Sequence, residues 1–208
     1  MTPRLFAEFD ALCRQFGATG NALEIGATST PDTLLNLPSL RNCDSRIGIN
    51  IAYEAAVPSG FILRGNGNDL SRFADGHFDV VVSNATLEHD PRFWLTLAEM
   101  RRVLKPGGLL LIGVPGYTRE RSWLRRLAGR VGNLPGFAAP LAVAVQGFGA
   151  GTATLLVHDY PGDYFRFSEQ ALREVLLQDT QVLATRVLEA PPRLLGVGRK
   201  PVASPSPV

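Results

Sequence analysis

The stretch between Gly76 and Pro115 constrains the fold of this chain more than any other part of it. It begins with a run of apolar and β-branched residues, from Phe78 to Ser83, of the kind that forms a strand buried on both faces. A second apolar run, from Leu109 to Val114, closes the stretch. The two runs predict neighbouring buried strands of a βαβ unit.

A helix is predicted between these two strands. Asp90 and Pro91 are typical of a helix start, with an acidic cap followed by proline at the first helical position. Lys105 lies in the last predicted turn, and Pro106-Gly107-Gly108 ends the helix. One face of this helix carries Phe93, Leu97, Met100 and Leu104. The loop 84–89 then lies at the carboxyl end of a strand, the edge where ligands bind in open α/β sheets.

Two motifs in this stretch carry a family resemblance. The first is FDVVVSNATLEH, at the first strand and its loop, and the second is MRRVLKPGGLLLIGVP, at the helix end and next strand. Together they resemble the second half of a small class I S-adenosylmethionine-dependent methyltransferase of the type 11 group, and the resemblance extends less strongly over residues 20–115. It implies an α/β fold with a Rossmann-like, doubly wound, mostly parallel seven-stranded sheet, an antiparallel C-terminal strand and a long inserted cap segment.

The rest of the chain is consistent with that fold. Helices are predicted to begin at Thr2-Pro3, at Pro31-Asp32 and after Ser168. Further strands are predicted at residues 22–26, 46–51, 61–64, 182–188 and 194–199. The inward-facing residues expected in the last helix are Leu172, Val175 and Leu176.

Length and composition fit one domain. With 208 residues the chain can bury a substantial core, and we expect a single domain over residues 1–202, with a cap at about 118–157 and a disordered tail at 203–208. A net charge of +2 gives no reason to expect a nucleic-acid partner. The two cysteines form no CxxC motif and the first residues lack a signal-peptide core, so a cytoplasmic protein with reduced thiols is expected. No metal site is predicted, and the sequence does not indicate an oligomeric state.

Segment 116–167, which contains the expected cap, is where acceptor specificity is expected, because loops on a rigid sheet commonly carry it. The segment begins with a basic amphipathic stretch at 119–131. Three interpretations of this stretch stay open: a solvated helix over the site, a contact with an anionic substrate, or a helix on a membrane surface. The apolar stretch that follows is broken by prolines, glycines and Gln146, whereas a membrane-spanning helix needs about 20 consecutive apolar residues. A membrane-spanning helix is therefore not expected, and membrane contact is the least favoured of the three interpretations.

The resemblance also implies where S-adenosylmethionine would bind. The positions that match the family's cofactor-binding segments are Glu24, Gly26, Ala27 and Thr28 after the first strand, Asn50 and Ile51 after the second, Asn66 and Gly67 after the third, and Asn84, Ala85 and Thr86 after the fourth. In the family, the acid before the first glycine meets the cofactor's ammonium group, and an acid at the tip of the second strand takes the ribose hydroxyls.

Several of these positions depart from the family pattern. Thr28 and Thr30 replace glycines, and a β-branched residue resists the positive φ that glycine allows. Asn50 and Asn66 replace acids, and a neutral amide makes weaker hydrogen bonds than a carboxylate. The sequence therefore leaves two hypotheses open: a methyltransferase with altered cofactor contacts, or a catalytically inactive scaffold or partner subunit.

The expected reaction is methyl transfer to oxygen or nitrogen of a small-molecule acceptor, such as a glycan or secondary-metabolite intermediate. The protein would mainly align nucleophile, methyl carbon and sulfur. His158, with Asp159 and Tyr160 beside it, is the first candidate for the general base, and His89 is the second. The alternative for the His158 segment is a polar brace that holds the cap to the sheet.

Overall fold

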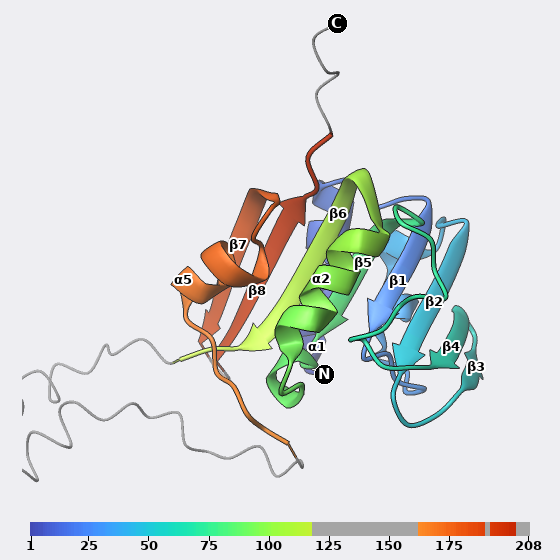
Figure 1. Ribbon diagram of the computed structural model, residues 1–208, viewed down its shortest axis with the longest axis horizontal. Helices are drawn as coiled ribbons and strands as arrows, with labels where there is room; N and C mark the ends of the chain where they lie inside the picture. Colours follow the sequence, from blue (N-terminus) through green and yellow to red (C-terminus); the bar gives the residue numbers. More distant parts are fainter. Residues whose placement is uncertain (118–161, 190–191, 203–208) are drawn as a thin grey trace, which may run out of the picture.

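The computed structural model describes residues 1–117, 162–189 and 192–202. Its centre is an eight-stranded sheet in the order β3-β4-β2-β1-β5-β6-β8-β7 (Figure 1). The strands are β1 Asn21–Ile25, β2 Ser45–Asn50, β3 Ala55–Val57, β4 Gly60–Arg64, β5 Phe78–Asn84, β6 Leu104–Pro115, β7 Gln181–Glu189 and β8 Pro192–Arg199. Strands β4, β2, β1, β5 and β6 run parallel, and β8 is antiparallel to β6. The predicted fold class is confirmed.

Helices cover both faces of the sheet, with α1 on one side and α2 and α5 on the other (Figure 1). The helical elements are α1 Pro3–Gln15, η1 Leu34–Asn36, η2 Pro38–Leu40, η3 Leu87–His89, α2 Phe93–Val103, α5 Glu169–Ala171 and η4 Leu172–Leu176. Alternate residues of the central strands supply the two cores. Val81 packs on the α2 face with Leu97 and Met100, whereas Val80 packs on the α1 face with Phe9.

The N-terminal helix starts as predicted. Thr2 has extended backbone angles and its hydroxyl accepts a hydrogen bond from the amide of Leu5. Leu5, Phe9 and Leu12 are buried against the sheet, and Cys13 is buried beside them as a free thiol. This helix therefore closes one face of the sheet.

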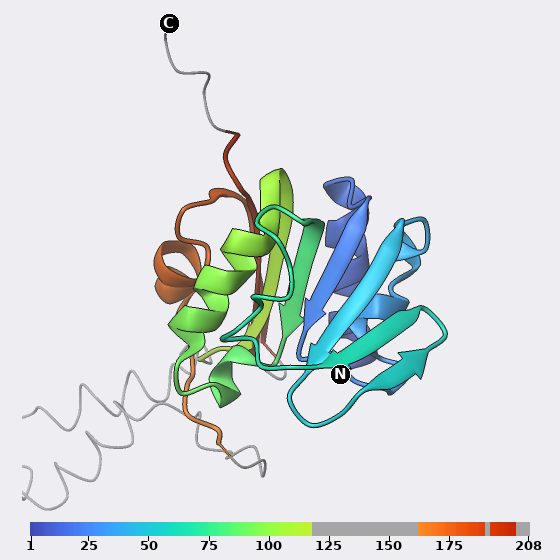
Figure 2. The same ribbon diagram turned by 45° about the vertical axis from the view of Figure 1, so that its right-hand side comes forward.

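The sheet has one strand more than the seven predicted. Strand β3 pairs antiparallel with β4, and Val57 lies opposite Gly60 across a tight turn (Figure 2). The segment was not predicted because Ala55–Val57 is too short to show a clear alternation. The hairpin lies at the outer edge of the sheet, beyond β4.

Several local predictions were wrong at the boundaries of elements. The segment after Pro31 forms two 3-10 turns instead of an α-helix, because Leu37 is held extended before Pro38. Asp90 is not the cap of α2, which begins at Phe93. Strand β6 begins at Leu104, opposite Phe78, so it includes the predicted helix-ending residues.

The helix after Ser168 turns a different set of residues toward the core than the sequence predicts. Ser168 caps it as expected, accepting a hydrogen bond from the amide of Ala171. The turn then widens into the π-helical η4, which shifts the inward face. Leu172 and Leu176 are buried as predicted, but Val175 is 42% exposed.

Candidate functional site

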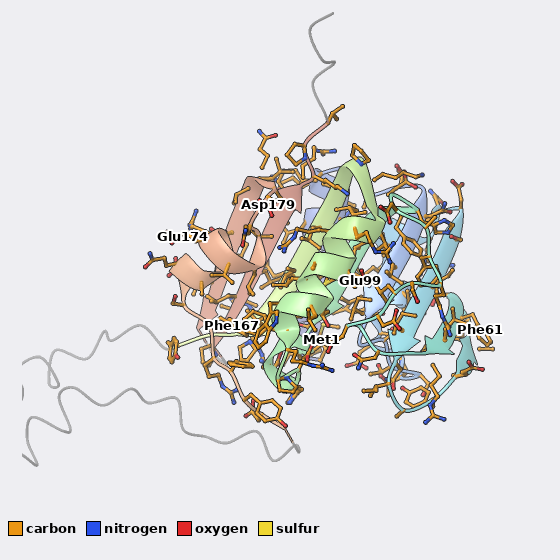
Figure 3. The ribbon with its side chains drawn as sticks, in the orientation of Figure 1. Met1, Phe61, Glu99, Phe167, Glu174 and Asp179 are labelled. Carbon is orange, nitrogen blue, oxygen red and sulfur yellow. The ribbon has the colours of Figure 1, made fainter. Side chains whose placement is uncertain are left out.

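The carboxyl ends of four parallel strands meet at one edge of the sheet. Ile25 at the end of β1 lies opposite Ile49 of β2 and Ser83 of β5, and Asn50 lies opposite Arg64 of β4. All the sequence-predicted cofactor residues stand at or just after these strand ends. Met1 and Phe167, labelled in Figure 3, also lie at this edge. The structure thus brings the predicted cofactor positions together.

Gly26 makes the first turn at this edge. Its φ is +82°, a conformation that favours glycine, and its amide donates to the Ile49 carbonyl at 2.9 Å. A side chain here would overlap the hydroxyl of Thr86. That hydroxyl in turn donates to the Ile25 carbonyl at 3.2 Å, so the loops after β1 and β5 are packed against each other.

The threonines that replace family glycines are bonded within their own loop. The hydroxyls of Thr28 and Thr30 lie 2.7 Å apart, and Thr30 donates to Asp32. The Ser29 amide donates to the Tyr53 hydroxyl at 3.0 Å, which ties this loop to the segment after β2. The side chains of Thr28 and Thr30 are exposed at the sheet edge.

Glu24 lies beneath that loop and is only 4% exposed. Its Oε2 accepts hydrogen bonds from the Thr33 hydroxyl at 2.6 Å and from the Leu35 amide at 3.0 Å. Burial raises the pKa of this carboxyl to about 7, although these hydrogen bonds lower it. Through these two hydrogen bonds, Glu24 holds the 3-10 turn η1 beneath the loop.

Asn50 ties the loops after β1 and β2 together. Its Nδ2 donates to the Ala27 carbonyl at 2.8 Å, and its Oδ1 accepts from the Ala52 amide at 2.8 Å. Ile51, between them, is 69% exposed. The asparagine therefore supplies a donor to Ala27 that the family's acid could not provide.

Asn50→Asp is expected to lower the free energy of unfolding by about 1–3 kcal/mol, because a carboxylate would face the Ala27 carbonyl without a proton to donate. Urea denaturation at neutral pH measures this. The matched control is Asn66→Asp, since Oδ1 of the exposed Asn66 only accepts a hydrogen bond, from the Asn68 amide. Equal stability of the two variants would contradict the role given to Asn50.

The loop after β4 contains a polar network that the sequence analysis missed. Asn68 donates from Nδ2 to the Asp90 carboxylate at 2.6 Å and to the Thr96 hydroxyl at 2.7 Å. Thr96 also donates to Asp90 at 2.7 Å. The Asp90 carboxylate therefore accepts hydrogen bonds in this network and does not cap α2. Gly67 packs closely on Thr96, and Asn66 stands exposed beside it.

The residues after β5 adopt a strained turn. Ala85 has a φ of +53°, and its amide donates to the Gly113 carbonyl at 3.0 Å. Asn84 Oδ1 is buried and accepts no hydrogen bond within the described ranges, while Nδ2 lies 3.6 Å from the Met1 sulfur. This oxygen lies close to Gly113 on the neighbouring strand β6.

Of the two candidate histidines, the structure describes only His89. His89 ends η3 at the same edge, is partly buried, and its amide donates to the Thr86 carbonyl at 3.0 Å. His158, the predicted cap at 118–157 and the tail at 203–208 lie outside the described residues. A catalytic role for either histidine stays a prediction.

Glu88 is a functional candidate that the sequence analysis did not identify. It is 2% exposed, and its Oε1 lies 3.8 Å from a guanidinium nitrogen of Arg193 on β8. Its backbone carbonyl accepts from the amides of Tyr164 and Phe165 at 2.8 and 3.3 Å. Burial raises the pKa of Glu88 to about 7, while Arg193 and Arg166 lower it. The LEH motif signalled this position, but only tertiary contacts show its surroundings.

In the described part of the chain, no group of three or more His, Cys, Asp or Glu residues could hold a metal ion. In the same residues no helix is both long and apolar enough to cross a membrane.

Comparisons with known proteins agree with this geometry. Residues 40–112 match the family model described as a methyltransferase domain. An uncharacterized methyltransferase of Mycobacterium avium is 42% identical over 57 residues, and one of Mycobacterium tuberculosis is 43% identical over 53 residues. These matches span 27% and 26% of this chain but only 22% and 20% of the relatives.

Solved structures share the fold over most of the chain. The 1,6-didemethyltoxoflavin-N1-methyltransferase of Burkholderia thailandensis, solved with S-adenosylhomocysteine, has a TM-score of 0.58 at 16% identity, covering 95% of this chain and 78% of that protein. The N-methyltransferase NodS of Bradyrhizobium japonicum has a TM-score of 0.55 at 15% identity, covering 96% and 87%. Residues 40–112 thus match a methyltransferase domain, and the chain shares the fold of solved methyltransferases that bind S-adenosylhomocysteine.

Proposed function

We propose that this protein transfers a methyl group from S-adenosylmethionine to a small-molecule acceptor. The observation that carries the proposal is the meeting of the Gly26 turn, the Asn50 tip and the Asn84 turn at one sheet edge. The family match and the relatives' names support the reaction class. When bound, the cofactor supplies an electrophilic sulfonium methyl group.

The residues at this edge fit such a cofactor. The Gly26 turn lets the main chain approach a ligand closely, because its left-handed backbone carries no side chain. We expect Asn66 and Gly67, which follow β4, to contact the adenine, as the family resemblance implies. Glu24 and Asn50 would support the cofactor site indirectly, because their side chains form hydrogen bonds that hold the loops.

Isothermal titration with S-adenosylhomocysteine tests the cofactor proposal. We expect binding, with a rise in melting temperature equivalent to about 2.7 kcal/mol at a ligand concentration one hundred times Kd. Absence of both heat and thermal shift at millimolar ligand would favour the second candidate, an inactive methyltransferase-like scaffold. That candidate is supported by the hydrogen bonds that already engage Glu24, Thr30 and Asn50.

A further inference from the structure

The most unusual side chain at the sheet edge outside the cofactor positions is that of Glu88. Its carboxyl group is almost completely buried, yet Oε2 accepts no hydrogen bond anywhere in the part of the chain that the structure describes. Leaving a buried acceptor unsatisfied costs about 1–3 kcal/mol, and more for a charged group. If Glu88 had only a structural role, its Oε2 would be expected to accept a hydrogen bond from a donor within the protein.

The charges around Glu88 come from two other elements. A guanidinium nitrogen of Arg193, on β8, lies 3.8 Å from Oε1 of Glu88. Arg166 and Asp163, from the segment that bonds to the Glu88 backbone, pair with each other and also act on the carboxyl electrostatically. The surroundings thus contain two guanidinium groups and one other carboxylate. With Glu88 ionised, two guanidinium groups therefore face two carboxylates and the charges balance. A protonated ammonium group would add an uncompensated buried positive charge here, whereas a neutral hydroxyl group would keep the balance.

We propose that Glu88 Oε2 accepts a hydrogen bond from a neutral hydroxyl group of the acceptor, so that the methyl group is transferred to oxygen. This inference rests on the proposed function and narrows it to O-methylation. As the acceptor oxygen bonds to the methyl carbon, the carbon–sulfur bond breaks and its electron pair stays on sulfur. The hydroxyl proton passes to Glu88 Oε2. Arg193, whose guanidinium group lies 3.8 Å from Oε1, stabilises the ionised carboxylate before the transfer.

The test uses two probes that differ only in the group offered to Glu88, benzyl alcohol and benzylamine. Calorimetry is done at about pH 8, where the carboxyl is ionised, with S-adenosylhomocysteine saturating. We expect benzyl alcohol to bind more tightly than benzylamine. Glu88→Gln should weaken the alcohol about 10- to 100-fold, because a hydrogen bond to a charged group is lost. The control is Glu174→Gln, on the outer side of η4 (Figure 3), which should change nothing.

The possible results separate the two proposals. Failure of S-adenosylhomocysteine to bind would reject the proposed function itself. If it binds but benzyl alcohol does not, or benzylamine binds more tightly, or Glu88→Gln leaves alcohol binding unchanged, the hydroxyl site is rejected and the methyltransferase proposal survives. Thermal denaturation of Glu88→Gln guards against misfolding, since removal of a buried ionisable group should preserve or raise the melting temperature at this pH.

Discussion

Replacing Gly26 with alanine is expected to lower the free energy of unfolding by about 2–5 kcal/mol and to weaken S-adenosylhomocysteine binding at least tenfold. Two costs add at this position: the left-handed backbone costs a non-glycine residue about 1–2 kcal/mol, and overpacking costs about 1–3 kcal/mol. The overlap is with the Thr86 hydroxyl, so relief requires the loops after β1 and β5 to separate. Urea denaturation and calorimetric titration measure the two effects.

A matched control separates the two costs. Gly17 has a φ of +71°, but an added side chain there would meet nothing within 4 Å, so Gly17→Ala should show only the backbone cost. Thr86→Gly in the Gly26→Ala background should recover the steric part, as a double-mutant cycle would show. If Gly26→Ala loses no more stability than Gly17→Ala, the packing of Gly26 on Thr86 is not a constraint on this site.

Stability is expected to fall as the pH rises from about 5 to about 7.5. Glu24 and Glu88 each have a pKa raised from 4.5 to about 7 by burial. In this window the folded protein keeps protons that the unfolded chain has released, so raising the pH favours unfolding. The stabilisation is fully present below pH 4.5 and is lost as the pH passes through about 7. One pKa unit is worth about 1.4 kcal/mol, so each group contributes on the order of 3 kcal/mol.

The measurement is urea denaturation across this pH range. Glu24→Gln and Glu88→Gln should each flatten the curve by about half, because the neutral amide has no proton to lose. The exposed Glu174 again supplies the control, Glu174→Gln. The carboxyls whose pKa is lowered, Asp79 and Glu99 among them, titrate at lower pH and so do not account for a slope in this window. A curve that stays flat or rises in the wild-type protein would show that neither glutamate is protonated when folded.

The sequence alone determined those features that depend on neighbours along the chain. The buried strands β1, β5 and β6 follow from short apolar runs, and the start of α1 follows from the Thr2 hydroxyl, which caps an amide three residues away. The family motifs then located the cofactor edge, because the carboxyl ends of parallel strands must meet there.

Only the tertiary structure decided what several of those residues do. Asn50 bonds Ala27, Asn68 bonds Asp90 and Glu88 lies beside Arg193, and each of these pairs is separated by many residues in the sequence. No local pattern encodes such pairs, because the partners meet only when strands and loops have packed. The same holds for the pKa of Glu88, which depends on burial and on the charges of Arg193, Arg166 and Asp163, all of them outside the motif LEH.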